Sequence, residues 1–149
     1  MHYLNDYQPG DTVALGTASV PQDEIDAFNQ RYDPQPQYLD DSLAGPLHGG
    51  RIASPWQAAA LAQSIFVREF LNQTADFGVS EIRAVRYDAP LRADTTVRGE
   101  LEINAVNDEP DRPDRGVIDA NILLFDADDQ RILSQNVIFS VSKKPRRCA

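Results

Sequence analysis

From Glu81 onward the chain alternates between apolar and polar residues, which is the pattern of β-strands that bury one face. The segments 107–114 and 126–130 are short and rich in turn residues, so the strands they connect are expected to pair antiparallel. A weaker alternation over 11–20 predicts one more strand near the start of the chain. The apolar residues expected to face the core are Val97, Leu101, Ile103, Ala105, Ile118, Ala120, Ile122, Leu124, Leu133, Val137, Phe139 and Val141.

A short helix is predicted after Pro21, where Ile25, Phe28 and Tyr32 recur at intervals of three and four residues. Such intervals place side chains on one face of a helix, so this element is expected to be amphipathic.

A second, longer helix is predicted from Trp56 to about Asn72. The Ser54 hydroxyl can cap its free backbone N–H groups, and Pro55 suits the first helical position because no N–H is needed there. Its apolar residues cover nearly every face, which is typical of a buried helix. They are Ala58, Ala59, Ala60, Leu61, Ala62, Ile65, Phe66, Val67, Phe70 and Leu71.

The segment between the two helices, from Asp33 to Ile52, contains three prolines and three glycines. We expect no regular structure over these roughly twenty residues. Loops of that length inside a compact domain usually carry function.

One buried helix followed by about four antiparallel strands predicts an α+β fold. A helix without a polar face needs a sheet that curls around it, which is the hotdog arrangement. The alternative from the pattern alone is an open α+β sandwich in which the helix lies flat on the sheet.

Length and composition predict a single domain over residues 1–149, with a flexible tail from Lys143 to Ala149. The formal charge of -9 argues against a nucleic-acid partner. The chain has no apolar run long enough to span a membrane and no secretory signal pattern at its start, so a soluble, cytoplasmic protein is expected. The single cysteine, Cys148, is expected to be a solvated thiol, and no metal or other cofactor is predicted.

Two segments carry most of the chemical information: FNQRYDPQPQY at 28–38 and GPLHGGRIAS at 45–54. With EIR at 81–83 and APLRADT at 89–95, they resemble the MaoC-like dehydratases and (R)-specific enoyl-CoA hydratases. The resemblance covers about residues 8 to 142. It implies a hotdog fold, a homodimer with sites at the interface, and an acyl thioester of coenzyme A or acyl carrier protein as ligand.

The resemblance further implies that Asp33 orients or deprotonates a water that adds to the double bond of the thioester. The family places a histidine five residues after this aspartate, where this chain has Tyr38. The reference pKa values of tyrosine and histidine, about 10 and about 6.5, differ by roughly 3.5 units, or about 5 kcal/mol for proton loss near neutral pH. Tyr38 is therefore a poor general base and a competent hydrogen-bond donor. The purely structural alternative is a side-chain turn at Asp33 and ring packing at Tyr38.

The remaining candidates lie around the start of the long helix. His48 is a candidate for the missing base, or else a gate or hydrogen-bond anchor. Gly49, Gly50, Ile52 and Ser54 are expected to present backbone N–H groups and the positive helix end to the thioester carbonyl. Trp56 is a candidate for lining the acyl tunnel or for a place in the core. We expect the Asp33 carboxyl to face an apolar channel beside this helix end.

Three functions remain open from the sequence. The first is a hydratase/dehydratase acting on 2-enoyl or 3-hydroxyacyl thioesters with an atypical Asp33/Tyr38 pair. The second is a binding module that lost turnover with the histidine. The third is a thioesterase, since the same scaffold hosts that reaction and a fold alone does not determine function.

Overall fold

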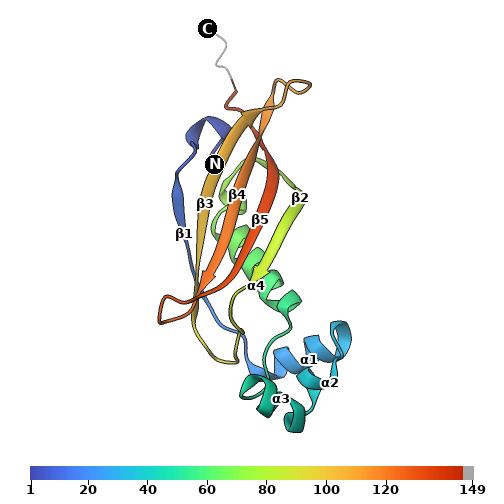
Figure 1. Cartoon of the computed structure of the whole chain (residues 1–149). Coiled ribbons are helices and arrows are strands. Elements are labelled where there is room, and N and C mark those ends of the chain that lie inside the picture. Colours follow the sequence, from blue (N-terminus) through green and yellow to red (C-terminus); the bar gives the residue numbers. More distant parts are fainter. Residues whose placement is uncertain (146–149) are drawn as a thin grey trace.

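One antiparallel sheet forms the body of the computed structural model, which describes residues 1–145 (Figure 1). Its strands are β1 (Thr12–Ala18), β2 (Asp76–Tyr87), β3 (Val97–Asp108), β4 (Arg115–Phe125) and β5 (Arg131–Ser142). Their order across the sheet is β1-β3-β4-β5-β2, so β1 and β2 are the two edges. The predicted strands and the antiparallel pairing of β3 with β4 and of β4 with β5 are confirmed.

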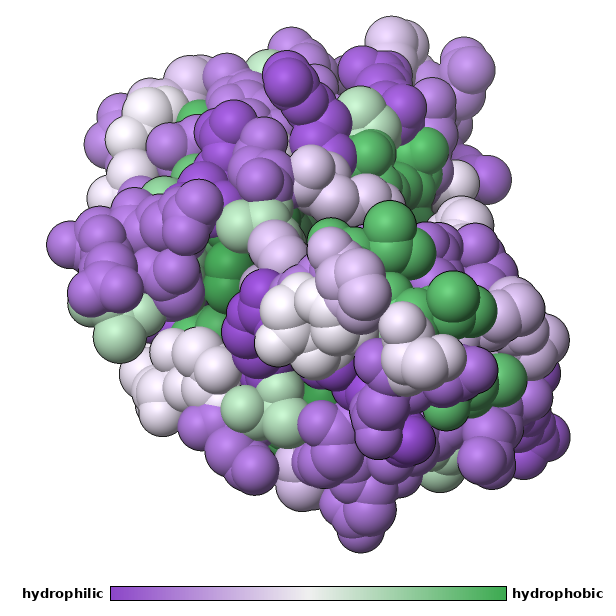
Figure 2. Space-filling view, turned by 60° about the horizontal axis from the view of Figure 1, so that its bottom comes forward, coloured by the Kyte–Doolittle hydropathy of each residue, from purple (hydrophilic) through white to green (hydrophobic). Residues whose placement is uncertain are grey.

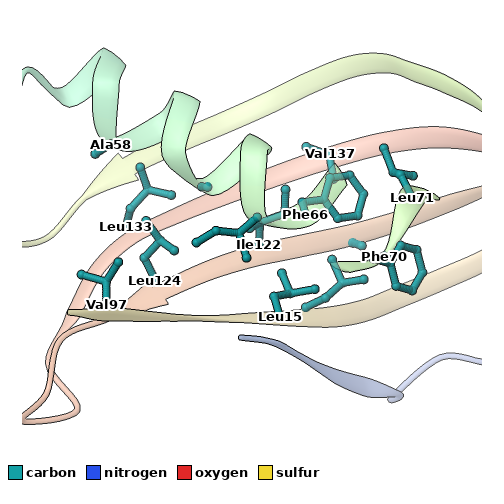
Figure 3. Packing of buried hydrophobic residues seen from close by; sticks show 14 of the residues in the cluster. Leu15, Ala58, Phe66, Phe70, Leu71, Val97, Ile122, Leu124, Leu133 and Val137 are labelled. Carbon is teal, nitrogen blue, oxygen red and sulfur yellow. The ribbon is translucent and has the colours of Figure 1, made fainter. Parts of the chain in front are cut away.

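The long helix α4 (Pro55–Glu69) crosses one face of the sheet, and a short 3-10 turn (Leu71–Gln73) follows it. Its side chains Ala58, Ala62, Ile65 and Phe66 pack on the inward residues of the strands, and Figure 3 shows this layer from close by. The predicted inward residues of β4 and β5 are fully buried at Ile118, Ala120, Ile122, Leu124, Leu133, Val137, Phe139 and Val141. This is the α+β hotdog fold that the sequence predicts.

The two faces of α4 differ, which corrects the prediction of a helix buried all round. Trp56 is 67% exposed and Ala60 is also exposed, because the sheet covers only the opposite side of the helix. A place for Trp56 in the core is therefore wrong.

Three short helices, α1 (Gln22–Tyr32), α2 (Pro36–Leu39) and α3 (Asp41–His48), gather at the end of the sheet where α4 begins (Figure 1). The predicted helix after Pro21 is confirmed, but the expectation of no regular structure over 33–52 is wrong. Pro36 occupies the first position of α2, where no N–H is required. The Asp40 side chain caps α3 by accepting the Ser42 N–H at 2.9 Å, and Pro46 is tolerated inside this short helix.

The segment after β5 begins with residues bonded to the body of the protein. The Lys143 N–H donates to the Asp114 carbonyl at 2.8 Å, and the Lys144 N–H donates to Asn5 Oδ1 at 3.1 Å. The rest of the predicted tail, including Cys148, lies outside the described residues. Among residues 1–145, none of the helices has the length and hydropathy needed to cross a membrane.

Candidate functional site

The carboxylate of Asp33 is held at the amino end of α4. Asp33 ends α1, where its N–H donates to the Asn29 carbonyl at 3.1 Å. Oδ2 accepts a hydrogen bond from Ser54 Oγ at 2.6 Å, and Oδ1 accepts one from Gln35 Nε2 at 2.7 Å. The side chain is partly buried, so one hydrogen bond to each oxygen orients the carboxylate while leaving lone pairs for a further partner.

Asn29 is a second tether between α1 and the segment that leads into α4. It is completely buried; Nδ2 donates to the Ile52 carbonyl at 3.2 Å and Oδ1 accepts the Ser54 N–H at 3.2 Å. Sequence reasoning missed this residue. The available signal was its place four residues after Ile25, on the face of α1 that is buried, where a polar side chain must find partners.

Ser54 joins these groups to the helix. Its Oγ donates to Asp33 and accepts the Trp56 N–H at 3.2 Å, which confirms the predicted cap. The amino end of a helix carries partial positive charge and favours negative charge nearby. The placement of the Asp33 carboxylate there is thus electrostatically favourable.

Tyr38 lies in α2 and is 7% exposed. Burial, and after it the nearby Asp33 carboxylate, raises the pKa of the Tyr38 phenol. The phenol therefore keeps its proton at neutral pH.

The ring of His48 stacks on that of Tyr38, with 6.0 Å between the centroids and 20° between the planes. Its Nε2 is buried and has no hydrogen-bond partner within the part of the chain that the structure describes. Asp33, Tyr38 and His48 thus lie at one end of the molecule, although no hydrogen bond among residues 1–145 joins either ring to Asp33.

The backbone donors before α4 are mostly engaged. Gly49 ends α3 with a φ of +74°, and its N–H donates to the Gly45 carbonyl at 2.9 Å. The N–H groups of Gly50 and Ser54 also have protein acceptors, at 3.3 and 3.2 Å. These three are thus not the free donors that the sequence suggested. The N–H of Ile52, in contrast, makes no hydrogen bond with any described residue.

An apolar hollow of about 260 Å³ adjoins this end of α4, and Ile52 forms part of its wall. Asp33 does not line this hollow. It accepts a hydrogen bond from Ser54, and the residue after Ser54, Pro55, is one of the lining residues. Trp56 is not among its lining residues and is exposed. The lining residues are Ile52, Ala53, Pro55, Ala58, Tyr87, Asp88, Ala89 and Pro90.

The far wall of the hollow, at the end of β2, was not foreseen from the sequence. The Ala53 N–H donates to the Leu91 carbonyl at 2.9 Å and so holds the segment before α4 against the segment after β2. Burial, followed by the neighbouring Tyr38, raises the pKa of Tyr87, the one lining residue with a phenol.

Neither a protein-family model nor a curated protein matches the chain. Among solved structures, a MaoC-like dehydratase from Rhodospirillum rubrum is 25% identical, with a TM-score of 0.84 over 98% of this chain and 100% of that one. A double-hotdog protein from Mycobacterium tuberculosis is 15% identical, with a TM-score of 0.79 over 99% of this chain and 46% of that one. The (R)-hydratase from A. caviae involved in PHA biosynthesis is 18% identical, with a TM-score of 0.66 over 93% and 98%.

These similarities extend over nearly the whole chain. This protein therefore has the hotdog fold and the overall structure of the MaoC-like dehydratases and (R)-hydratases.

Proposed function

We propose that the protein is a hydratase/dehydratase that adds water reversibly to 2-enoyl thioesters of coenzyme A or acyl carrier protein. The observation that carries the proposal is the hydrogen bond of 2.6 Å from Ser54 to Asp33, which holds a carboxylate beside an apolar hollow at the amino end of α4. The structural similarity to MaoC-like dehydratases and (R)-hydratases agrees with this chemistry.

In the proposed reaction the acyl group occupies the hollow, and the thioester carbonyl accepts a hydrogen bond from the Ile52 N–H. Asp33 removes a proton from water as the water oxygen bonds to C3, and the electrons of the double bond move toward the carbonyl oxygen. The Ile52 N–H and the positive helix end stabilise the negative charge on that oxygen. The proton then passes to C2, which restores the thioester carbonyl and gives the 3-hydroxyacyl product.

Tyr38 is assigned the role of hydrogen-bond donor to the attacking water or to the product hydroxyl. Its raised pKa leaves the phenol protonated at neutral pH, so Asp33 is the only base of the pair. His48, stacked on the phenol, is assigned to position it.

Tyr38→Phe is expected to lower kcat for crotonyl-CoA hydration about tenfold, the usual effect of losing one hydrogen bond. Because a protonated donor is required and the pKa of Tyr38 is raised, deprotonation of Tyr38 is expected to lower the wild-type rate only at pH values above the ordinary range of a phenol. Steady-state hydration, followed by loss of enoyl absorbance, measures both effects. Unchanged kcat in Tyr38→Phe would remove the phenol from the mechanism, and Tyr32→Phe, at an exposed tyrosine on α1, serves as the matched control.

The second candidate is a thioester-binding module without turnover. It is favoured by the replacement of the family histidine with a buried tyrosine of raised pKa. The same assay separates the two functions, because Tyr38→His is then expected to create activity that the wild type lacks. Release of free thiol from saturated thioesters would instead point to a thioesterase.

We also propose that two copies of the chain pair along β2. This edge strand has 12 residues, and its Phe77 and Ile82 are 52% and 53% exposed. Exposed apolar edge strands pair readily with other strands. Seen toward the helical end of the molecule, hydrophobic patches also reach the surface among hydrophilic ones (Figure 2).

Ile82→Lys is expected to convert the proposed dimer into a monomer, because a buried interface does not accept an unpaired ammonium group. Size-exclusion chromatography with light scattering measures the molecular mass of the protein in solution. The matched control is Ala14→Lys on β1, the opposite edge of the sheet, which is expected to leave the dimer intact. A monomeric wild type, or a folded Ile82→Lys dimer, would contradict pairing through β2.

A further inference from the structure

A second hollow lies directly behind the wall of the first. The residues Asp88, Ala89 and Pro90 line both of them. The second hollow has a volume of about 280 Å³, and its other lining residues are polar: Arg92, Thr95, Asp126 and Gln130. A ligand whose acyl end fills the apolar hollow would therefore meet a polar surface as its chain passes over this wall.

Arg92 differs in its partners from Arg51 and Arg131, two arginines whose charges are compensated. Arg51 forms ion pairs with Asp26 at 3.2 Å and with Asp41 at 2.8 Å. Arg131 forms an ion pair with Asp88 at 2.8 Å. Arg92 has no carboxylate within ion-pair distance among residues 1–145, so its charge is available to a ligand.

The guanidinium of Arg92 is nevertheless held in place. Its Nη2 donates to the His48 carbonyl at the end of α3. The group also lies over Gly49, where an added Cβ would be 3.7 Å from Nη2 and 4.0 Å from Nη1. One of its five N–H groups is thus used, and the others remain for a second partner. Arg92 is positioned beside the segment that leads from α3 into α4.

The carboxylates that line the polar hollow are engaged with other groups. Asp88 is neutralised by Arg131. Oδ1 of Asp126 accepts the N–H groups of Asp128 and Gln130, both at 2.9 Å, within the turn between β4 and β5. Arg92 is the one cation among the residues that line this hollow, while Asp126 keeps its negative charge. A planar guanidinium is well suited to bind phosphate oxygens.

We propose that Arg92 binds the phosphate at the end of the pantetheine arm, the group that coenzyme A and acyl carrier protein share. This assignment rests on the proposed function, since it takes the acyl thioester to occupy the apolar hollow. It makes the polar hollow the path of the carrier arm and Arg92 the residue that recognises an acyl phosphopantetheine.

The test uses saturated butyryl thioesters, which cannot be hydrated, so binding is measured apart from turnover. Titration calorimetry compares butyryl-pantetheine, butyryl-phosphopantetheine and butyryl-CoA. The wild type is expected to bind the phosphorylated arm about tenfold more tightly than the unphosphorylated one, as for a hydrogen bond between charged groups. Arg92→Gln is expected to abolish that preference, and Asp126→Asn to increase it. Arg68→Gln, an exposed arginine on α4, is the matched control.

Several results would overturn the assignment. One is a wild type without preference for the phosphorylated arm, and another is an Arg92→Gln variant that keeps the preference. In a third, Arg92→Gln keeps the preference for butyryl-phosphopantetheine over butyryl-pantetheine and loses only the tighter binding of butyryl-CoA relative to butyryl-phosphopantetheine. That result would place the contact of Arg92 on the nucleotide phosphates of coenzyme A. An Arg92-dependent preference in a protein that does not hydrate enoyl thioesters would support this inference and contradict only the proposed function.

Discussion

Asp33→Asn is expected to lower kcat for hydration of a 2-enoyl thioester by about 10³-fold, within the range for loss of a general base. Asparagine has the same shape and still accepts the Ser54 hydrogen bond through its amide oxygen, but it takes no proton from water. Because the acyl group is bound by the apolar hollow, KM is expected to change little. Steady-state hydration of crotonyl-CoA by the purified variant measures both constants.

The matched control for this result is Asp40→Asn, a neighbouring acidic residue. Asp40 caps α3 through Ser42, and asparagine caps helices as well as aspartate does. We expect this variant to retain wild-type kcat. Retention of more than a tenth of the activity by a folded Asp33→Asn protein would refute the role of Asp33 as base.

Phe66→Ala is expected to lower the free energy of unfolding by about 4 kcal/mol, the usual cost of removing a buried aromatic ring. Phe66 is completely buried in α4. Its ring meets that of Phe139 edge-on at 5.4 Å and stacks on that of Phe70 at 5.6 Å. Its removal leaves a cavity between the helix and the sheet. Urea unfolding at one fixed protein concentration measures the change, since association shifts apparent stability.

The control for the core is Leu47→Ala, because Leu47 is 62% exposed on α3. Its effect is expected to stay within about 0.5 kcal/mol. A Phe66→Ala protein that unfolds at the wild-type urea concentration with an unchanged slope would show that α4 is not anchored through this ring.

The sheet was predictable because each strand packs only one face against α4. Period-two alternation therefore identified eight buried residues of β4 and β5 correctly, from Ile118 to Val141. It did not identify Leu123, Ile132, Gln135 and Ile138, which are also buried. The segment 33–52 was not predictable by the same reasoning. Short helices such as α2 and α3 gain most of their stability from packing, here through the buried Tyr38 and Ala44. The number of prolines and glycines in a segment carries no information on that packing.

Some residues of the candidate site were predictable from the sequence, but most of their hydrogen-bond partners and neighbours were not. Asp33 was identified from a turn motif, Ser54 from a helix cap, and Ile52 from the segment before the cap, whereas Asn29 and Tyr87 were not identified. A buried asparagine on an amphipathic helix resembles an ordinary polar position until its partners are known. Trp56, in contrast, was expected near the ligand or in the core and is exposed.

The amino-acid sequence by itself determined the order of the strands and of helices α1 and α4, the capped start of α4, and the presence of an aspartate followed five residues later by a tyrosine. These features depend on local periodicity and on neighbouring residues. Only the tertiary structure decided that Asp33 meets Ser54, 21 residues later, and that Arg92 reaches the end of α3, 44 residues earlier. Hydrogen-bond partners, burial and charge compensation arise where distant segments approach one another, and no local pattern encodes that approach.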